Sequence, residues 1–198
     1  MAIKIFIDQG HNPTNPNAGA ESGGVLEQDV NFEVGRRLAA LLNANPNFEA
    51  RLSRPTPETQ LGTSTTTSLQ ARAAAANSWP ADYFLSLHCN ANTNSNISGT
   101  EGYVFALQTR AAEMAEDILE GISDMTGLRD RGVYARPTLY VLRATEMPAA
   151  LIELGYLTNS NDRELLVYDP EKNEWAIGNS ALRMEENPGM IVFRELMR

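Results

Sequence analysis

The segment DYFLSLH at residues 82–88 decides the fold, because a short apolar run of this kind is typical of a buried strand. A second run, IKIFI at residues 3–7, is followed four residues later by His11. His88 closes the first run, so each of the chain's two histidines lies just beyond an apolar strand. In an open α/β sheet, ligands bind beyond the carboxyl ends of the strands, so we expect both imidazoles to face one crevice. Neutral imidazole is the commonest metal ligand, which makes a two-histidine metal site the first hypothesis.

Helical and strand patterns alternate along the rest of the chain. Apolar spacing or alanine content indicates helices at 26–44, 68–77 and 109–126, with Ser68 as an N-cap and Gly127 as a C-cap. Further strands are expected at 48–53, 102–107, 138–142 and 149–154, a short helix near 165–168, and one more helix within 176–198. This alternation predicts an α/β fold: a single domain with a mixed, mostly parallel sheet of about six strands, flanked by helices on both faces.

Composition excludes several classes of partner. The 198 residues carry a formal net charge of -9, which argues against a nucleic acid partner and against attraction to an anionic membrane. No segment reaches the ~20 apolar residues that span a bilayer. No basic segment followed by an apolar one precedes the first strand, so no signal peptide is expected and the chain is expected to be synthesised in the cytoplasm.

The single cysteine, Cys89, directly follows His88. It has two interpretations, as a nucleophile or metal ligand and as a small residue packed at a strand end. Free cysteine is usually buried, so packing is the favoured interpretation.

A catalytic zinc site takes three protein ligands and leaves one position for water. The two histidines therefore need a partner, and Glu27 is the best candidate because it lies in the first turn of the expected helix at 26–44. Asp29 and Glu33 compete with it for this role.

Metal-assisted hydrolysis also needs a general base. Glu153 lies within the apolar segment AALIELGY at 149–156, where a charge is costly unless it is paired or linked to a metal. A buried salt bridge to Arg72 or Arg54 is the alternative interpretation. The residues alone thus favour a zinc-type hydrolase with a His-Glu-His site and a glutamate base.

Four motifs occur in the order typical of one enzyme family. They are DQGHN at 8–12, GVLEQDVN at 24–31, SLHCNA at 86–91 and LIELGYLTN at 151–159. Three lesser motifs agree: LQAR at 69–72, RGV at 131–133 and LYVLR at 139–143. The ordered set resembles the zinc-dependent N-acetylmuramoyl-L-alanine amidases of the amidase-3 type over roughly residues 1–165, and residues 166–198 form a divergent tail.

This resemblance implies one Zn²⁺ ion held by His11, Glu27 and His88, with Glu153 as the catalytic glutamate. The implied substrate is peptidoglycan or a muropeptide, cleaved between N-acetylmuramic acid and L-alanine. The implied place of action is the cell wall, for a phage-type lysin or an excised catalytic domain.

Three alternatives stay open at this point. A zinc carboxypeptidase-like enzyme would need a cationic clamp for a terminal carboxylate, for which Arg136 and Arg143 are candidates. A non-catalytic wall-binding module would have no need for Glu153. In the third alternative, both histidines are ordinary core residues of an α/β domain.

Overall fold

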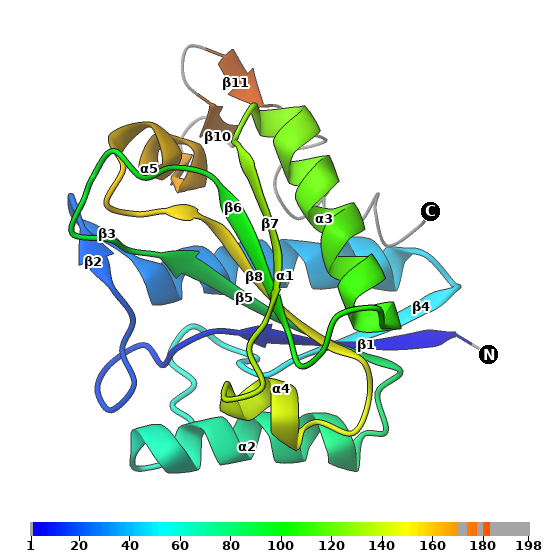
Figure 1. Ribbon diagram of the computed structural model, residues 1–198. Coiled ribbons are helices and arrows are strands. Elements are labelled where there is room, and N and C mark those ends of the chain that lie inside the picture. Colours follow the sequence, from blue (N-terminus) through cyan, green and yellow to red (C-terminus); the bar gives the residue numbers. More distant parts are fainter. Residues whose placement is uncertain (1, 170–173, 178–179, 183–198) are drawn as a thin grey trace.

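The computed structural model describes residues 2–169, 174–177 and 180–182, and its centre is a six-stranded sheet (Figure 1). The sheet has the order β4-β1-β5-β8-β6-β7. Its strands are β1 (Ile3–Gln9), β4 (Phe48–Leu52), β5 (Tyr83–Asn90), β6 (Thr100–Val104), β7 (Asp130–Ala135) and β8 (Ala149–Tyr156). The helices are α1 (Glu27–Ala44), α2 (Thr65–Ser78), α3 (Arg110–Thr126), α4 (Tyr140–Ala144) and α5 (Ser160–Leu166). The shorter strands are β2 (Glu21–Ser22), β3 (Val25–Leu26), β9 (Tyr168–Asp169), β10 (Glu174–Ile177) and β11 (Ser180–Leu182).

Most neighbouring strands in the large sheet are parallel. The pairs β4–β1, β1–β5, β5–β8 and β6–β7 are parallel, and β8–β6 is antiparallel. The predicted α/β class, with a mixed and mostly parallel sheet of six strands, is therefore confirmed. The parallel run β1–β5–β8 brings the carboxyl ends of three strands to one edge.

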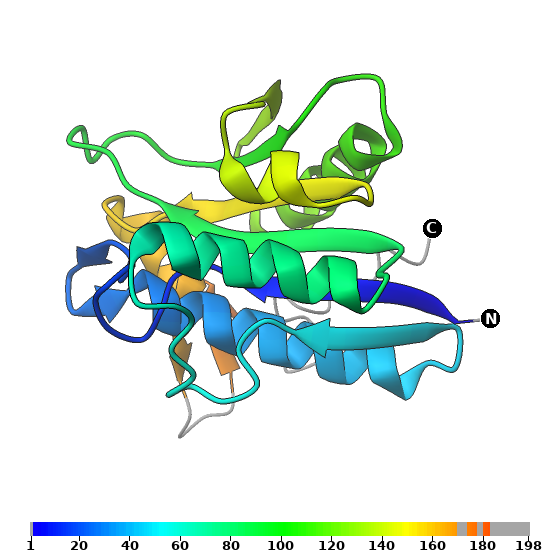
Figure 2. The same ribbon diagram turned by 90° about the horizontal axis from the view of Figure 1, so that it is seen from below.

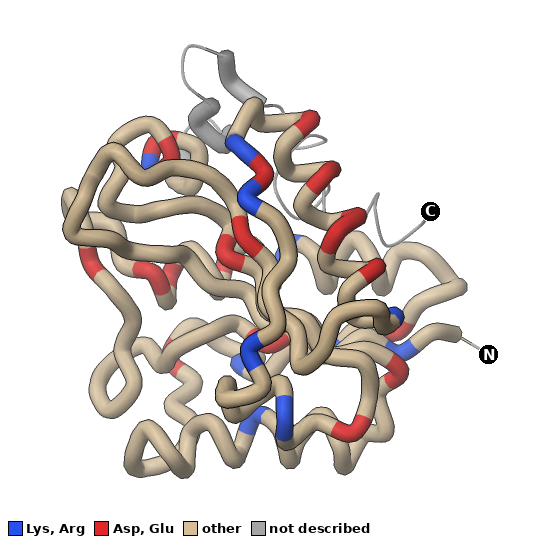
Figure 3. Tube along the Cα trace, in the orientation of Figure 1, with Lys and Arg blue, Asp and Glu red and all other residues tan. Residues whose placement is uncertain are grey.

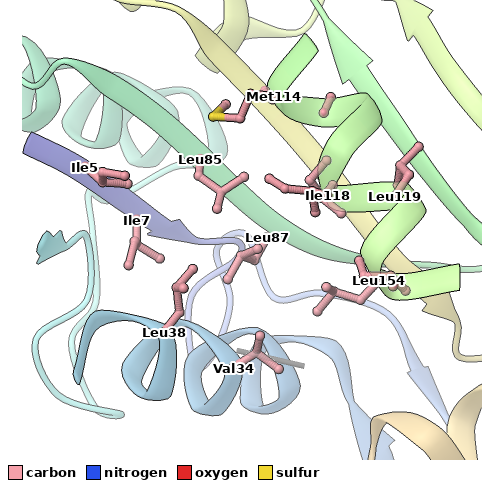
Figure 4. Close-up of a cluster of buried hydrophobic side chains, with 14 of the residues drawn as sticks. Ile5, Ile7, Val34, Leu38, Leu85, Leu87, Met114, Ile118, Leu119 and Leu154 are labelled. Atoms are coloured by element: carbon pink, nitrogen blue, oxygen red, sulfur yellow. The ribbon is translucent and has the colours of Figure 1, made fainter. Parts of the chain in front are cut away.

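Helices cover both faces of the sheet, as predicted, and each face has its own core. On one face, α1 and α3 pack Val34, Leu38 and Ile118 against Leu85 and Leu87 of β5, as Figure 4 shows. On the other face, α2 and α4 lie side by side beneath the sheet (Figure 2). There Phe6 stacks on Phe84 with 5.9 Å between ring centroids, against Ala76, Trp79 and Val141.

The segment at 138–142 is not a strand, contrary to the prediction. Most of it belongs to the single-turn helix α4, because this turn buries Val141 and Leu142 together against α2. The strand at this edge is instead β7, which the sequence analysis missed. Its charged and glycine-containing sequence, DRGVYA, suits an edge strand that faces water.

The second helix begins at Thr65, not at Ser68. Ser64 is the N-cap and forms a capping box with Thr67, whereas Ser68 is buried and accepts a hydrogen bond from Asn17. The expected strand at 102–107 ends at Val104, and Phe105 and Leu107 are exposed.

The expected helix near 165–168 is α5, which ends earlier, at Leu166. Within 176–198, the described residues 176–177 and 180–182 are strand, and the rest of that predicted helix lies outside the described residues. Among the residues that the structure describes, none of the helices has the length and apolar character needed to cross a bilayer.

Gly127 ends α3 in the left-handed conformation, at φ 73°, as the predicted C-cap. No atom lies within 4 Å of the place that a Cβ would take, so a side chain there would not clash. The remaining cost is that of holding a residue with a Cβ in the left-handed backbone conformation. We expect Gly127→Ala to lower the free energy of unfolding by about 1 kcal/mol. Gly127→Asn should lower it less, because asparagine tolerates this conformation. Urea denaturation measures both, and equal losses for the two variants would contradict this explanation.

Candidate metal centre

The two histidines lie together beyond the ends of neighbouring strands. Gln9 of β1 pairs with Leu87 of β5, so the residues that follow each strand emerge at the same edge of the sheet. The ring centroids of His11 and His88 are 4.8 Å apart, and the rings are inclined by 77°. Both side chains are about one-fifth exposed, so they are not ordinary core residues. They lie together at one edge of the sheet, as the strand pattern predicted.

The carboxylate of Glu27 completes this cluster from the first turn of α1. Its Oε1 atom lies 3.1 Å from His11 Nε2 and 2.9 Å from His88 Nδ1. The backbone N–H of Cys89 donates to the same oxygen at 3.1 Å, and that of Ala20 donates to Oε2 at 2.9 Å. Burial alone would raise the pKa of Glu27, but its hydrogen bonds with the two histidines lower it below the ordinary value. The cluster therefore holds an ionised carboxylate between two imidazoles.

The spacing of these atoms suits a small divalent cation. One ligand atom from each of His11, Glu27 and His88 lies within 4.8 Å of the others. Zinc lies about 2.0–2.2 Å from nitrogen and oxygen ligands, so the ligand atoms of a tetrahedral site stand about 3.3 Å apart. The distances of 3.1 and 2.9 Å are close to that edge. The donor set of two imidazoles and one carboxylate is also one that zinc prefers.

The two carboxylates that competed with Glu27 lie elsewhere. Glu33 is paired with Arg36 at 2.8 Å, and Asp29 is exposed. Neither belongs to the candidate cluster found among the described residues.

Close backbone packing fixes the orientation of the cluster. A Cβ on Gly10 would stand 2.4 Å from the His88 ring, and one on Gly19 would stand 2.8 Å from the Glu27 carboxylate. His11 has a positive φ of 68°, which is uncommon for a residue other than glycine. Its Nδ1 lies 3.3 Å from the carbonyl oxygen of Asn17, so donation by Nδ1–H leaves Nε2 free to bind a cation.

A buried arginine holds the backbone that carries His11. Nη1 of Arg72 donates to Asp8 Oδ1 at 2.6 Å and to the carbonyl oxygen of Gln9 at 2.7 Å. Its Nη2 donates to the carbonyl oxygen of His11 at 2.5 Å. Ser86 Oγ donates to the other oxygen of Asp8 at 2.8 Å. Burial alone would raise the pKa of Asp8, but the Arg72 charge and these hydrogen bonds keep it below its ordinary value.

Glu153 lies beside the metal-ligand cluster on the next strand. In the register of the sheet it pairs with His88 on one side and with Glu101 on the other. Its Oε2 atom is buried and has no hydrogen-bond partner among the described residues. Burial first, and then the charges of Glu27 and Glu101, raise the pKa of Glu153 to about 8. A divalent cation nearby would act in the opposite direction, because it stabilises the ionised form.

The alternative interpretation of Glu153, a buried salt bridge, is wrong. Arg72 is paired with Asp8. Arg54 donates instead to the carbonyl oxygens of Gln28 and Pro57, at 3.0 and 2.8 Å.

The sequence analysis missed Glu101, which extends the row of polar residues across the sheet. Its carboxylate accepts hydrogen bonds from Tyr103 Oη at 2.6 Å, and from Tyr156 Oη and Arg131 Nε at 2.5 Å each. Burial alone would raise its pKa, but these donors lower it. Glu101 could have been recognised as a candidate site residue because it is a charged residue inside the strand TEGYV, which is the reasoning that identified Glu153.

Cys89 is buried and packs within the apolar core on the α1 face, as the favoured interpretation predicted. Burial is the first cause that raises the pKa of its thiol well above the ordinary value. Such a thiol is a poor nucleophile. The contribution of this residue to the site comes through its backbone N–H, which contacts Glu27.

Comparison with known proteins identifies the same family that the sequence motifs resemble. The family model Amidase_3, described as N-acetylmuramoyl-L-alanine amidase, matches residues 5–180. The amidase CwlM of Bacillus licheniformis is 38% identical over 166 residues, which cover 83% of this chain and 60% of CwlM. The amidase LytC of Bacillus subtilis is 36% identical over 164 residues, which cover 82% of this chain and 31% of LytC. The chain thus spans 31% of the length of LytC and 60% of that of CwlM.

A solved structure agrees with the sequence relatives. The crystal structure of an N-acetylmuramoyl-L-alanine amidase from Clostridium difficile 630 superposes with a TM-score of 0.80 at 26% identity. The match covers 99% of this chain and 95% of that one.

The Asp8–Arg72 pair generates a prediction about stability. Asp8→Asn leaves Arg72 buried with an uncompensated charge, which should lower the free energy of unfolding by about 3–5 kcal/mol. The matched control is Glu49→Gln, which breaks an exposed ion pair with Arg51 at 3.7 Å and should cost less than about 1 kcal/mol. Chemical denaturation of both variants is the measurement. Similar losses would show that burial of the pair is unimportant.

The same pair predicts how stability depends on pH. Because the pKa of Asp8 is lower in the folded chain than in the unfolded one, its contribution is complete above the unfolded value and is lost as the pH falls through the folded value. The difference in unfolding free energy between wild type and Asp8→Asn should be constant above about pH 5 and shrink below about pH 4. A difference that grows toward acid would contradict the sign of this shift.

Proposed function

This chain belongs to the Amidase_3 family of N-acetylmuramoyl-L-alanine amidases, and from that premise we propose that it hydrolyses peptidoglycan. The bond cleaved is the amide between the lactyl group of N-acetylmuramic acid and L-alanine of the stem peptide. The observation that carries the proposal is the meeting of His11, Glu27 and His88 beside the unpartnered carboxylate of Glu153. Residues 1–198 would act as one catalytic domain at the cell wall, in a phage-type lysin or in a larger wall hydrolase.

We assign His11 Nε2, Glu27 Oε1 and His88 Nδ1 as ligands of one zinc ion. Their mutual distances and their chemistry support this assignment. Zinc bound there would polarise the scissile carbonyl and lower the pKa of a water molecule. The N–H groups of Cys89 and Ala20 keep the Glu27 carboxylate in place, so the site is organised before the cation binds.

Glu153 is assigned as the general base and then the general acid. It accepts the proton of the attacking water as the new C–O bond forms, and it gives a proton to the alanine nitrogen as the C–N bond breaks. The lack of a hydrogen-bond partner for Oε2 among the described residues supports this role, because no protein group competes for that oxygen. Burial first, and then the charges of Glu27 and Glu101, raise the pKa of Glu153 above that of an ordinary glutamate.

The alternatives from the sequence have less support. The two relatives and the solved structure described above are amidases, which disfavours a carboxypeptidase-like enzyme. A wall-binding module would have no use for a buried carboxylate without a partner. The core-histidine alternative conflicts with the partial exposure of both imidazoles and their convergence on Glu27.

The proposal predicts that a variant of the general base and a variant of a metal ligand differ in their zinc content. Glu153→Gln should retain zinc and lose about 10²–10⁴-fold in kcat on purified muropeptides. His88→Ala should lose zinc affinity as well as activity, because two ligands remain. Zinc content by elemental analysis and the release of new alanine amino termini are the two measurements.

The matched control is Glu33→Gln, on the same helix as Glu27 and outside the cluster, which should keep both zinc and activity. Near-full activity in Glu153→Gln would exclude the assigned base. A purified wild-type protein that takes up no zinc would exclude the metal site.

A further inference from the structure

Positive charge is concentrated on one flank of this acidic chain. The chain has 25 acidic residues and 16 Lys and Arg residues, but residues 129–143 contain four arginines and one aspartate. In Figure 3, blue segments recur along β7 and down to α4, whereas red segments follow α3. This flank borders the row that holds Glu153, because β7 is separated from β8 only by β6.

Glu101 and neighbouring aromatic side chains connect this flank to Glu153. Glu101 pairs in register with Glu153, and Tyr103 donates a hydrogen bond to Glu101. The rings of Tyr103 and Tyr134 have centroids 6.4 Å apart. The guanidinium carbon of Arg136 lies 5.4 Å from the centroid of the Tyr103 ring and 5.8 Å from that of the Tyr134 ring. Two rings therefore orient one exposed guanidinium.

Arg136 has no acidic partner, which distinguishes it from Arg131. Arg131 is bound to Glu101 at 2.5 Å. No ion pair joins Arg136 to a carboxylate of the described residues, and its Nη1 donates to the carbonyl oxygen of Ala135 at 3.4 Å. Arg143 lies over the ring of Tyr140 and lines a separate hollow with Phe105 and Glu146. Arg136 thus lies next to Tyr103 with a charge that no acidic group of the described residues neutralises.

The distance from Glu153 suits the stem peptide. Strands about 4.8 Å apart with a rise of about 3.3 Å per residue put the Cα atoms of Glu153 and Tyr103 about 8 Å apart. Arg136 follows Ala135, which is level with Val104 of β6 and Ala150 of β8, so its Cα lies two strands and about four residues from Glu153, and its guanidinium rests over the Tyr103 ring. An extended peptide advances at most about 3.3–3.6 Å per residue, so a stem peptide that runs from Glu153 along this face needs about three residues to reach the Tyr103 ring. The stem peptide carries carboxylates beyond L-alanine, and amidation removes their charge.

We propose that Arg136, oriented by Tyr103 and Tyr134, binds a carboxylate of the stem peptide beyond the cleaved amide. This inference rests on the proposed function and adds a specificity subsite to it. A guanidinium presents a planar pair of N–H donors that matches a carboxylate, and the tyrosine rings limit the freedom that it would lose on binding. The subsite discriminates stem peptides with free carboxylates from amidated ones. It also gives a role in an amidase to an arginine that the sequence analysis considered only as a carboxypeptidase clamp.

The test compares two synthetic muropeptides whose stems differ only in that the carboxylates beyond L-alanine are free in one and amidated in the other. Zinc-loaded wild type should show a KM about tenfold lower for the free-carboxylate substrate. Arg136→Ala should raise that KM to the value for the amidated substrate and leave kcat within about twofold, because no reacting atom is touched. The matched control is Arg110→Ala, an exposed arginine in the first turn of α3, which should keep the wild-type preference.

Titration calorimetry with the two stem peptides, free of sugar, gives the same comparison without turnover. If wild type cleaves neither muropeptide but binds the free-carboxylate peptide through Arg136, the proposed function fails and the subsite stands. Equal affinity of wild type for the two peptides would overturn the subsite. So would an Arg136→Ala variant that keeps the preference, or an Arg110→Ala variant that loses it equally.

Discussion

The buried contact between Arg72, Asp8 and the backbone that follows β1 is the interaction on which the site depends. One guanidinium neutralises Asp8 and also binds the carbonyl oxygens of Gln9 and His11. These carbonyls belong to the turn in which His11 takes a positive φ, so Arg72 satisfies polar groups that a regular strand would have paired. Because Ser86 of β5 contacts the same aspartate, the turn is also tied to the strand that carries His88. Both imidazoles are therefore fixed relative to one buried ion pair.

Three carboxylates lie close together in this site, and their surroundings make them chemically different. Glu27 is surrounded by imidazoles and backbone N–H groups, and Glu101 by two tyrosines and an arginine. Both have lowered pKa values, so their negative charges persist and act on the glutamate between them. Glu153 lacks comparable donors and is the one whose pKa is raised. Paired titratable groups whose environments push their pKa values apart are a general feature of acid–base catalysis.

The elements that could be predicted from the sequence are those with a strong local signal. The buried strands β1, β5 and β8 are apolar runs, and α1 and α3 have regular apolar spacing, so the centre of the sheet and the positions of His11, His88 and Glu153 followed from pattern. Pattern alone left Glu27 as one of three candidate carboxylates, and the family resemblance selected it. The edge of the sheet at β7 was harder to predict. The segment at 138–142 has the composition of a strand, but contact with α2 makes most of it a helix, and the charged edge strand β7 has no apolar pattern. Arg72 and Glu101 were missed as site residues because their partners are distant in the sequence, and only the register of the sheet brings those partners close.

The metal-ligand cluster lies at the centre of the sheet and Arg136 at its edge, and these two places tolerate sequence change to different degrees. His11, His88 and Glu153 are attached to central strands and Glu27 to α1, which packs on them, so a change of backbone there would disturb the apolar cores. Arg136 follows the outermost strand and is held mainly by ring contacts, next to an irregular connection that leads into a single-turn helix. Insertions or exchanges in that connection alter few buried groups. Under the proposed subsite, a change in specificity would therefore need changes only in this exposed margin, with the ligand cluster and Glu153 left as they are.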